Sequence, residues 1–212
     1  MPDYSKLDHF SLKAQKEGYP ARSVYKLKEM DEKFGLLKPA RGKASATFKV
    51  LDLGAAPGSW SLYVLRKLSS PKEGGPSLVS IDLTPLSRQY DQGLFDRPDF
   101  RFMQGDFTLP EIREAIFSHA PYNLVLSDAA PATTGNRSVD TLRSLDLAET
   151  VLYYAETALA KGGNMAVKVF QGGDTGALLK KIRGLFESAK SFKPQACRSE
   201  SFETYYLGLG KK

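Results

Sequence analysis

Val50-Leu51-Asp52-Leu53-Gly54-Ala55-Ala56-Pro57-Gly58-Ser59-Trp60 is the stretch that decides the fold of this 212-residue chain. It predicts a buried strand over residues 48–53, a tight turn of small residues and a helix that begins near Ser59. Gly54 and Gly58 allow the backbone to turn sharply and to approach a ligand with no Cβ in between. The positive end of the following helix would face that ligand. The stretch therefore predicts a nucleotide-cofactor site at the carboxyl end of the first strand of an open α/β sheet.

The spacing of the glycines restricts which cofactor could bind. A dinucleotide fingerprint would read G-x-G-x-x-G, and a phosphate-binding P-loop would end in Gly-Lys-Ser/Thr. Here three residues separate Gly54 from Gly58, and the turn contains no lysine. This favours a cofactor without phosphates and disfavours an NAD-dependent oxidoreductase. A strand-to-helix turn that binds no ligand is the alternative at this point.

The composition is that of one globular α/β domain, which we assign to residues 1–212. The single cysteine, Cys197, cannot form an internal disulfide, and no apolar run approaches the roughly 20 residues that span a bilayer. We therefore expect a cytoplasmic monomer without membrane contact. With one cysteine and two histidines, His9 and His119, we expect no metal site and interpret these three residues as structural or surface residues.

The net charge of +6 is concentrated at the two ends of the chain. Residues 1–43 contain ten Lys/Arg against six Asp/Glu, and residues 180–212 contain eight against three. The centre of the chain consequently carries a small acidic excess. Basic ends around an acidic centre suggest a polyanionic partner such as nucleic acid, with a solvated basic surface as the alternative.

Strands alternate with helices along the chain, as a doubly wound sheet requires. Residues 48–210 would form a Rossmann-like core, and residues 1–43 a basic helical N-terminal segment. Besides the strand over 48–53, strands are expected over 78–82, 100–103, 124–128, 165–170 and 204–209. Helices are expected within 1–18 and 21–30, from Ser59, over 110–119 behind a Thr108–Glu111 capping box, from about 138 to just before Gly162 with Leu142 facing inward, and from an Asp174 cap to 186.

Polar residues gather where the predicted strands end. Four carboxylates, those of Asp52, Asp82, Asp106 and Asp128, lie at or near strand ends, where ligands collect in such sheets. Asp82 is placed to bind both hydroxyls of a ribose, although each aspartate alone could simply form a turn. Lys168 lies inside an apolar run, so it must be paired, or displayed in a cleft, or on an edge strand with its amine in water.

Several motifs in order resemble the FtsJ-like ribose 2′-O-methyltransferases, over about residues 8–208. They are Asp-Leu-Gly-Ala-Ala-Pro-Gly-x-Trp (52–60), Ser127-Asp128-x-Ala130-Pro131, Lys168-Val169-Phe170-Gln171-Gly172, Lys193-Pro194 followed by Arg198 and Glu203-x-Tyr205, and the N-terminal Ala21-Arg22-Ser23-x-Tyr25-Lys26-Leu27. The resemblance implies a Rossmann-like class I methyltransferase fold that depends on S-adenosylmethionine. Its sheet has seven strands, mostly parallel with a reversed last strand, and helices on both faces.

The resemblance also implies residue roles. S-adenosylmethionine would lie along Gly54, Pro57, Gly58 and Trp60, with Asp82 at its ribose, Asp106 near its adenine and Asp128 near its methionine end. A catalytic tetrad would consist of Lys26, Asp128, Lys168 and Glu203, with Glu200 as a competitor for the last position. Ser59 departs from the family, which usually has a second glycine there, but it is small enough to preserve the turn.

The chemistry of the reaction suggests a division of labour among these residues. A ribose 2′-hydroxyl is a poor nucleophile and must lose a proton as it meets the activated methyl group. We expect Lys168 to accept that proton, because burial and neighbouring Lys26 disfavour its charged form. Asp128 would orient Lys168, and Glu203 with Lys26 would hold the ribose.

By the same resemblance, the substrate is a uridine of large-subunit ribosomal RNA. Phosphate contacts are expected from the basic ends, including Lys13, Lys16, Arg22 and Arg198. Tyr25, together with Tyr19 and Phe10, could stack on an unpaired base or simply pack the N-terminal helices. The alternatives are a methyltransferase that acts on a transfer RNA or cap ribose, and a non-catalytic RNA-binding factor of ribosome assembly.

Overall fold

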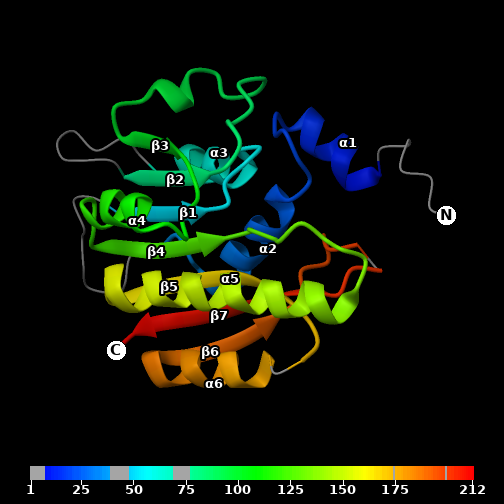
Figure 1. Ribbon diagram of the computed structural model, residues 1–212. Helices are drawn as coiled ribbons and strands as arrows, with labels where there is room; N and C mark the ends of the chain where they lie inside the picture. Colours follow the sequence, from blue (N-terminus) through cyan, green and yellow to red (C-terminus); the bar gives the residue numbers. More distant parts are fainter. Residues whose placement is uncertain (1–7, 39–47, 69–76, 174, 199) are drawn as a thin grey trace.

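The computed structural model describes the whole chain except residues 1–7, 39–47, 69–76, 174 and 199. Within this part, seven strands form one sheet in the order β3-β2-β1-β4-β5-β7-β6 (Figure 1). Strand β7 runs antiparallel to its neighbours β5 and β6, and all the other pairings are parallel. The strands are β1 (Val50–Leu53), β2 (Leu78–Asp82), β3 (Phe100–Gln104), β4 (Tyr122–Ser127), β5 (Leu159–Phe170), β6 (Phe186–Phe192) and β7 (Glu203–Lys211). The predicted fold class is confirmed.

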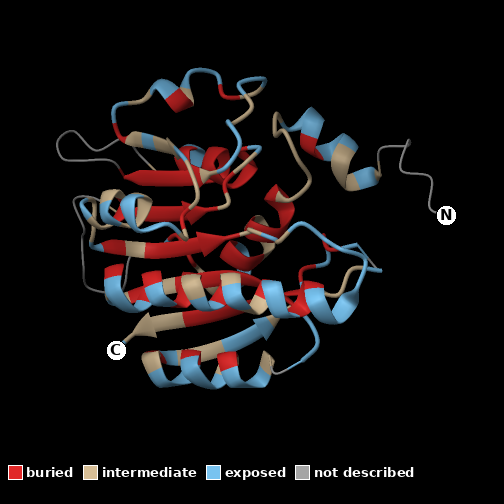
Figure 2. Ribbon diagram, in the orientation of Figure 1, coloured by how far each residue is buried: buried red, intermediate tan, exposed pale blue. Residues whose placement is uncertain are grey.

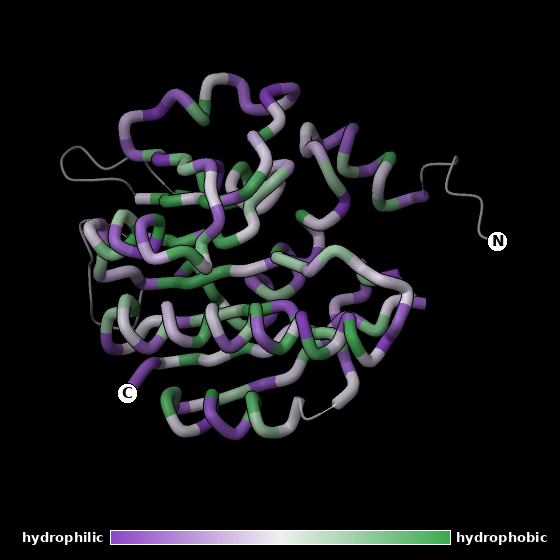
Figure 3. Tube along the Cα trace, viewed as in Figure 1, coloured by the Kyte–Doolittle hydropathy of each residue, from purple (hydrophilic) through white to green (hydrophobic). Residues whose placement is uncertain are grey.

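Helices cover both faces of the sheet, and each face has its own apolar core. One core packs helices α1, α2 and α3 against one face, and the other packs α4, α5 and α6 against the opposite face. Buried residues follow the strands and the inner sides of the helices (Figure 2), and the hydrophobic residues have the same distribution (Figure 3). The helices are α1 (His9–Lys16), α2 (Val24–Phe34), α3 (Ser59–Lys67), η1 (Leu94–Asp96, a 3₁₀ turn), α4 (Pro110–Phe117), α5 (Arg137–Ala158) and α6 (Thr175–Leu185). Within the described ranges, none of these helices combines the length and apolarity needed to span a bilayer.

The strands differ from the prediction made from the residues in two places. Strand β6 has no counterpart in the pattern of residues, because it is an edge strand with four polar residues among seven and needs few apolar side chains. Strand β5 begins at Leu159 rather than at Met165, and Gly162 lies inside it instead of following the preceding helix. The register of β5 against β4 shifts between the Tyr122–Leu159 and Leu124–Asn164 pairs, so residues 160–163, which contain Gly162, form an irregularity in this pairing.

Two helix predictions were also wrong, and a third cannot be assessed. Thr108 does not cap α4, because its hydroxyl and backbone N–H both donate to Asp106 Oδ1. Leu142 is 60% exposed rather than inward-facing; it lies in the first turns of α5, next to Arg143, which lines a cavity. The expected Asp174 cap lies outside the described residues.

The turn after β1 is held where only glycine fits. Gly54 has φ +77°, and a Cβ at this position would lie 2.6 Å from Ala129 Cβ. Gly58 has φ +106°, and its Cβ would lie 2.9 Å from the Phe95 ring. Both positions are therefore closed to other residues by backbone conformation and by space. As a result, the turn lies tightly against the chain that leaves β4.

Asp52, beneath this turn, is a fully buried carboxylate with few partners. Its Oδ2 accepts a hydrogen bond of 2.7 Å from Ser61 Oγ, which also lies 3.0 Å from Ser80 Oγ. Its Oδ1 has no hydrogen-bond partner among the described residues. Burial, aided by the negative charges of Asp128 and Asp82, raises the pKa of Asp52 to about 7. The folded protein therefore holds a proton on Asp52 at a pH where the unfolded chain has lost it.

We predict that Asp52→Asn changes the pH dependence of stability. Between about pH 4 and pH 7 the wild-type protein should lose free energy of unfolding as pH rises, because only its folded state keeps the Asp52 proton. The variant lacks this loss. The stability difference, variant minus wild type, should rise by at most about 1.4 kcal/mol per pH unit in this range and stay constant above it. Urea unfolding at a series of pH values measures this difference; a flat difference would contradict the prediction.

Candidate active site

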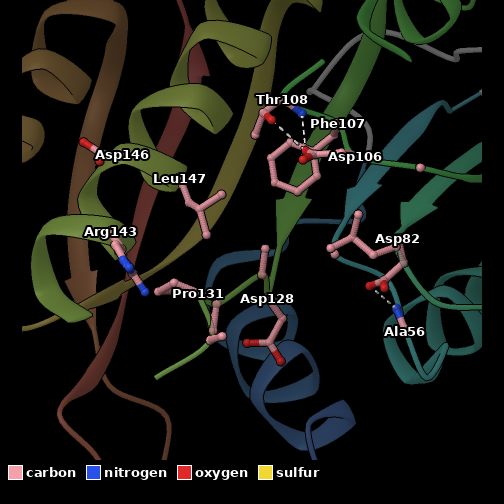
Figure 4. Close-up of a pocket in the computed structure, with 16 residues that line it drawn as sticks. Ala56, Asp82, Asp106, Phe107, Thr108, Asp128, Pro131, Arg143, Asp146 and Leu147 are labelled. Carbon is pink, nitrogen blue, oxygen red and sulfur yellow. Dashed lines mark hydrogen bonds between the residues drawn. The ribbon is translucent and has the colours of Figure 1, made fainter. Parts of the chain in front are cut away.

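Two cavities meet at the carboxyl end of the sheet. The first, here called the strand-end cavity, has a volume of about 510 Å³ and is shown in Figure 4. The second, here called the basic cavity, has a volume of about 580 Å³. The strand-end cavity is lined by Gly54, Ala56, Asp82, Leu83, Gly105–Thr108, Asp128–Ala132, Arg143, Asp146 and Leu147. The basic cavity is lined by Arg22, Ser23, Lys26, Ala130, Thr133, Lys168, Phe170, Ala196, Arg198 and Glu200–Glu203.

Hydrogen bonds from nearby backbone fix two carboxylates in the strand-end cavity (Figure 4). Asp82 Oδ2 accepts from the Ala56 N–H at 2.9 Å, and its Oδ1 accepts from the N–H and hydroxyl of Thr84. Asp106 Oδ1 accepts from the N–H of Thr108 at 2.8 Å and from its hydroxyl at 2.7 Å. The cavity thus presents negative charge in defined positions, with Leu83 and Phe107 as apolar parts of its lining.

The predicted cofactor residues divide into two groups. Gly54, Asp82, Asp106 and Asp128 line the strand-end cavity, whereas Pro57, Gly58 and Trp60 do not. Trp60 is 2% exposed, and its indole N–H donates to the Ser23 carbonyl at 2.8 Å. Its ring packs on that of Tyr205 at a centroid distance of 5.9 Å. In this structure Trp60 therefore joins α3 to the start of α2 and to β7.

Ser59, the departure from the family pattern, makes the same connection. Its hydroxyl accepts from the Ala21 N–H at 2.9 Å and donates to the Ala21 carbonyl at 3.1 Å. A glycine could make neither bond. The serine consequently ties the glycine turn to the segment that carries Arg22 and Lys26.

Sequence reasoning missed the contribution of α5 to the strand-end cavity. Arg143, Asp146 and Leu147 line the side of the cavity opposite Asp82 (Figure 4). The periodicity of this helix indicated only which residues face the core. The first turns of α5 lie beyond the ends of the strands (Figure 1), so their residues face the cavity instead of the core. This follows from the topology and not from the sequence pattern.

The four predicted tetrad residues come together between the two cavities. Lys168 Nζ lies 3.1 Å from Asp128 Oδ1 and donates to the Asp128 carbonyl at 2.5 Å. Lys26 Nζ lies 2.9 Å from Glu203 Oε1 and 3.9 Å from Asp128 Oδ1. Glu200 also lines the basic cavity, but the carboxylate that pairs with Lys26 is that of Glu203. All four side chains are at most 16% exposed.

Tyr205 is a fifth member of this cluster that sequence reasoning quoted but did not assign. It lies directly opposite Lys168 in the β5–β7 pairing, on the same face of the sheet. Its hydroxyl donates to Asp128 Oδ1 at 2.6 Å, and its ring is fully buried. Asp128 Oδ1 is therefore shared by one hydroxyl and two amines. The two-residue spacing of Glu203 and Tyr205 in a strand is the signal that could have placed both on one face.

The charges of this cluster support one another. Burial favours the neutral acid at Asp128, but Lys168, Lys26 and the Tyr205 hydroxyl hold its pKa below the ordinary value. Burial favours the neutral amine at Lys26, but Asp128 and Glu203 raise its pKa above the ordinary value.

The predicted RNA-binding residues are distributed unevenly. Arg22 and Arg198 line the basic cavity; Arg22 also pairs with Asp8 and donates to the Ala196 carbonyl at 2.6 Å. Lys13 and Lys16 are exposed on α1 and line neither cavity. Tyr25 is 4% exposed and packs against Phe10, so its ring is not available to stack on a base. Among the described residues, no group of three or more His, Cys, Asp or Glu could hold a metal ion.

Known proteins share both the sequence and the fold. The family model of FtsJ-like methyltransferases matches residues 19–211. A ribosomal RNA large subunit methyltransferase E of Treponema denticola is 51% identical over 99% of this chain and 97% of its own length. The protein of that name from Borrelia garinii subsp. bavariensis is 43% identical over 95% of both chains. The solved structure of a Plasmodium falciparum protein described as a ribosomal RNA methyltransferase superimposes with a TM-score of 0.69, at 25% identity, over 91% of this chain and 98% of its own. This chain belongs to the FtsJ-like methyltransferase family.

Proposed function

We propose that this chain transfers the methyl group of S-adenosylmethionine to a ribose 2′-hydroxyl of RNA, on a uridine of large-subunit ribosomal RNA. The observation that carries the proposal is the cluster of Lys26, Asp128, Lys168 and Glu203 at the boundary of the two cavities. The names of the related proteins support ribosomal RNA as the substrate, and the reaction would then take place in the cytoplasm.

The residues of the strand-end cavity fit S-adenosylmethionine better than a dinucleotide. Its lining includes four carboxylates, those of Asp82, Asp106, Asp128 and Asp146, and one cationic side chain, that of Arg143. Such a lining favours a cationic cofactor and repels a pyrophosphate. Asp82 would bind the ribose hydroxyls, Asp106 with Leu83 and Phe107 would hold the adenine, and Asp128 would lie near the methionine end.

The side chains between the cavities would hold the ribose and remove its proton. When bound, the cofactor supplies a methyl group already activated by a positive sulfur. Lys26 and Glu203 would hold the ribose from the basic cavity. Lys168 Nζ would take the proton that the ribose 2′-hydroxyl loses in the transfer. Lys168 must therefore enter the reaction as a neutral amine, with Asp128 and Tyr205 holding its position.

The test of the substrate is methyl transfer from radiolabelled S-adenosylmethionine. Unmethylated large ribosomal subunits, transfer RNA and capped RNA are compared as acceptors. The proposal expects label in large-subunit RNA, in a dinucleotide that resists alkali because its 2′-oxygen is methylated. Label in transfer RNA or at a cap would favour the other ribose methyltransferases. Binding to subunits without transfer would favour a non-catalytic assembly factor.

We predict that Asp82→Ala weakens S-adenosylmethionine binding about 10- to 100-fold, because hydrogen bonds to a charged carboxylate are lost. Isothermal titration measures the dissociation constant. Asp82→Asn is the matched variant, since it keeps an oxygen for the Ala56 N–H and so separates the loss of charge from loosening of the turn. An unchanged dissociation constant in both variants would refute the role of Asp82.

We predict that Lys168→Met lowers the rate of methyl transfer about 10²- to 10⁴-fold, the range for loss of a general base. Cofactor binding should stay nearly unchanged, because Lys168 does not line the strand-end cavity. Lys161→Met is the control, since Lys161 is an exposed lysine on the same strand. Wild-type transfer by the Lys168 variant would exclude this residue as the base.

We predict that Tyr205→Phe raises the pKa of Asp128 and lowers the rate of methyl transfer about tenfold. The lost hydroxyl helps to hold the pKa of Asp128 low and to fix the carboxylate that positions Lys168. Carboxyl ¹³C NMR titration follows the pKa, and the radiolabel assay follows the rate. Tyr206→Phe, on the opposite face of β7, is the control and should leave both unchanged. An unshifted Asp128 pKa in the Tyr205 variant would contradict this role of the hydroxyl.

A further inference from the structure

An aromatic wall stands on one side of the basic cavity. Phe170 and Phe202 both line the cavity, and their ring centroids lie 4.7 Å apart. Phe202 is half-buried, so part of its ring is covered by packing and part is accessible. The guanidinium carbon of Arg137 lies over the Phe202 ring, 5.1 Å from its centroid.

The backbone holds this wall beside the cluster that would act on the ribose. The Gln171 N–H donates to the Phe202 carbonyl at 2.8 Å, just beyond the point where Phe170 pairs with Glu203. Phe202 therefore directly precedes the carboxylate that binds Lys26. A ribose held by Lys26 and Glu203 carries a base one bond away, and that base must lie within reach of the same cavity lining.

The other side chains of the cavity suit different parts of a nucleotide. Arg22 and Arg198 bring positive charge, which suits phosphates. Lys26 and Lys168 are engaged with carboxylates. The flat apolar surface that a base requires is supplied by Phe202, whose ring is backed by the buried Phe170 at an interplanar angle of 56°.

Arg137 adds a second planar group at a place where its charge is unfavourable. It is the first residue of α5, where the helix dipole disfavours a cation. Its guanidinium lies over the ring of Phe202, although Arg137 itself does not line the basic cavity.

We infer that Phe202, with the Arg137 guanidinium over its ring, is the platform on which the base of the target nucleotide stacks. The inference rests on the proposed function and assigns a base subsite to the basic cavity. It replaces the N-terminal aromatic residues as candidates, because neither Tyr25 nor Phe10 lines the cavity. A stacking wall of this kind selects an unpaired base by its flat face rather than by its hydrogen-bonding edge.

The test compares two short synthetic RNAs that contain the target nucleotide in its unmethylated form. One carries the natural base there, and the other carries an abasic ribonucleotide, which keeps the ribose and its 2′-hydroxyl. Binding is measured by fluorescence anisotropy in the presence of S-adenosylhomocysteine. The proteins are wild type, Phe202→Leu, which keeps an apolar side chain against Phe170, and Phe202→Tyr, which restores an aromatic ring.

The inference expects wild type and Phe202→Tyr to bind the natural RNA more tightly than the abasic RNA. Phe202→Leu should weaken binding of the natural RNA about 5- to 100-fold and leave binding of the abasic RNA unchanged. Arg137→Ala should have a smaller effect in the same direction. Equal weakening on both RNAs, or no preference of the wild type for the natural base, would overturn the subsite. Failure of the proposed function is distinguishable, because it would appear as absent methyl transfer in the radiolabel assay.

Discussion

The site depends on one oxygen atom, Asp128 Oδ1, and on the three groups that converge on it. Lys168 Nζ lies at 3.1 Å, the Tyr205 hydroxyl at 2.6 Å and Lys26 Nζ at 3.9 Å. A buried carboxylate is unstable without such partners, and a buried amine without a carboxylate is equally so. Each group is therefore held where it is because the others are there. Removing one partner would leave the rest with uncompensated charge.

The sheet topology is what allows these groups to meet. Asp128 follows β4, the lysine lies inside β5, and the tyrosine lies opposite that lysine on β7. Because β7 runs antiparallel, its first residues reach the end of the sheet where the parallel strands finish. Only a reversed strand inserted beside β5 brings Glu203 and Tyr205 to that end. The reversed strand is thus a requirement of the site as well as a feature of the fold.

The sequence was informative where one residue type alone satisfies a constraint. Gly54 predicted the tight turn that the structure contains, and the apolar run around Lys168 restricted this lysine to a few options, of which pairing with a carboxylate is the one observed. Prediction failed where the constraint is tertiary. Strand β6 needs little apolar character at an edge, and the first turns of α5 extend past the strands, so Leu142 is exposed and Arg143 lines a cavity. The packing of Trp60 on Tyr205 and its hydrogen bond to the Ser23 carbonyl are likewise tertiary contacts that the motif alone does not indicate, and its cofactor role stays a prediction.

The two cavities on either side of Asp128 have linings of opposite charge, which determines where each ligand would bind. The strand-end cavity has an acidic lining that attracts a cation, whereas the basic cavity has four cationic side chains against two carboxylates, an excess of positive charge that attracts phosphates. A cationic methyl donor and a polyanionic acceptor would therefore enter from different sides. Their reacting atoms could meet only at the boundary, beside Lys168. The same separation keeps the positive charge of the donor away from Arg22 and Arg198, the two arginines that line the basic cavity.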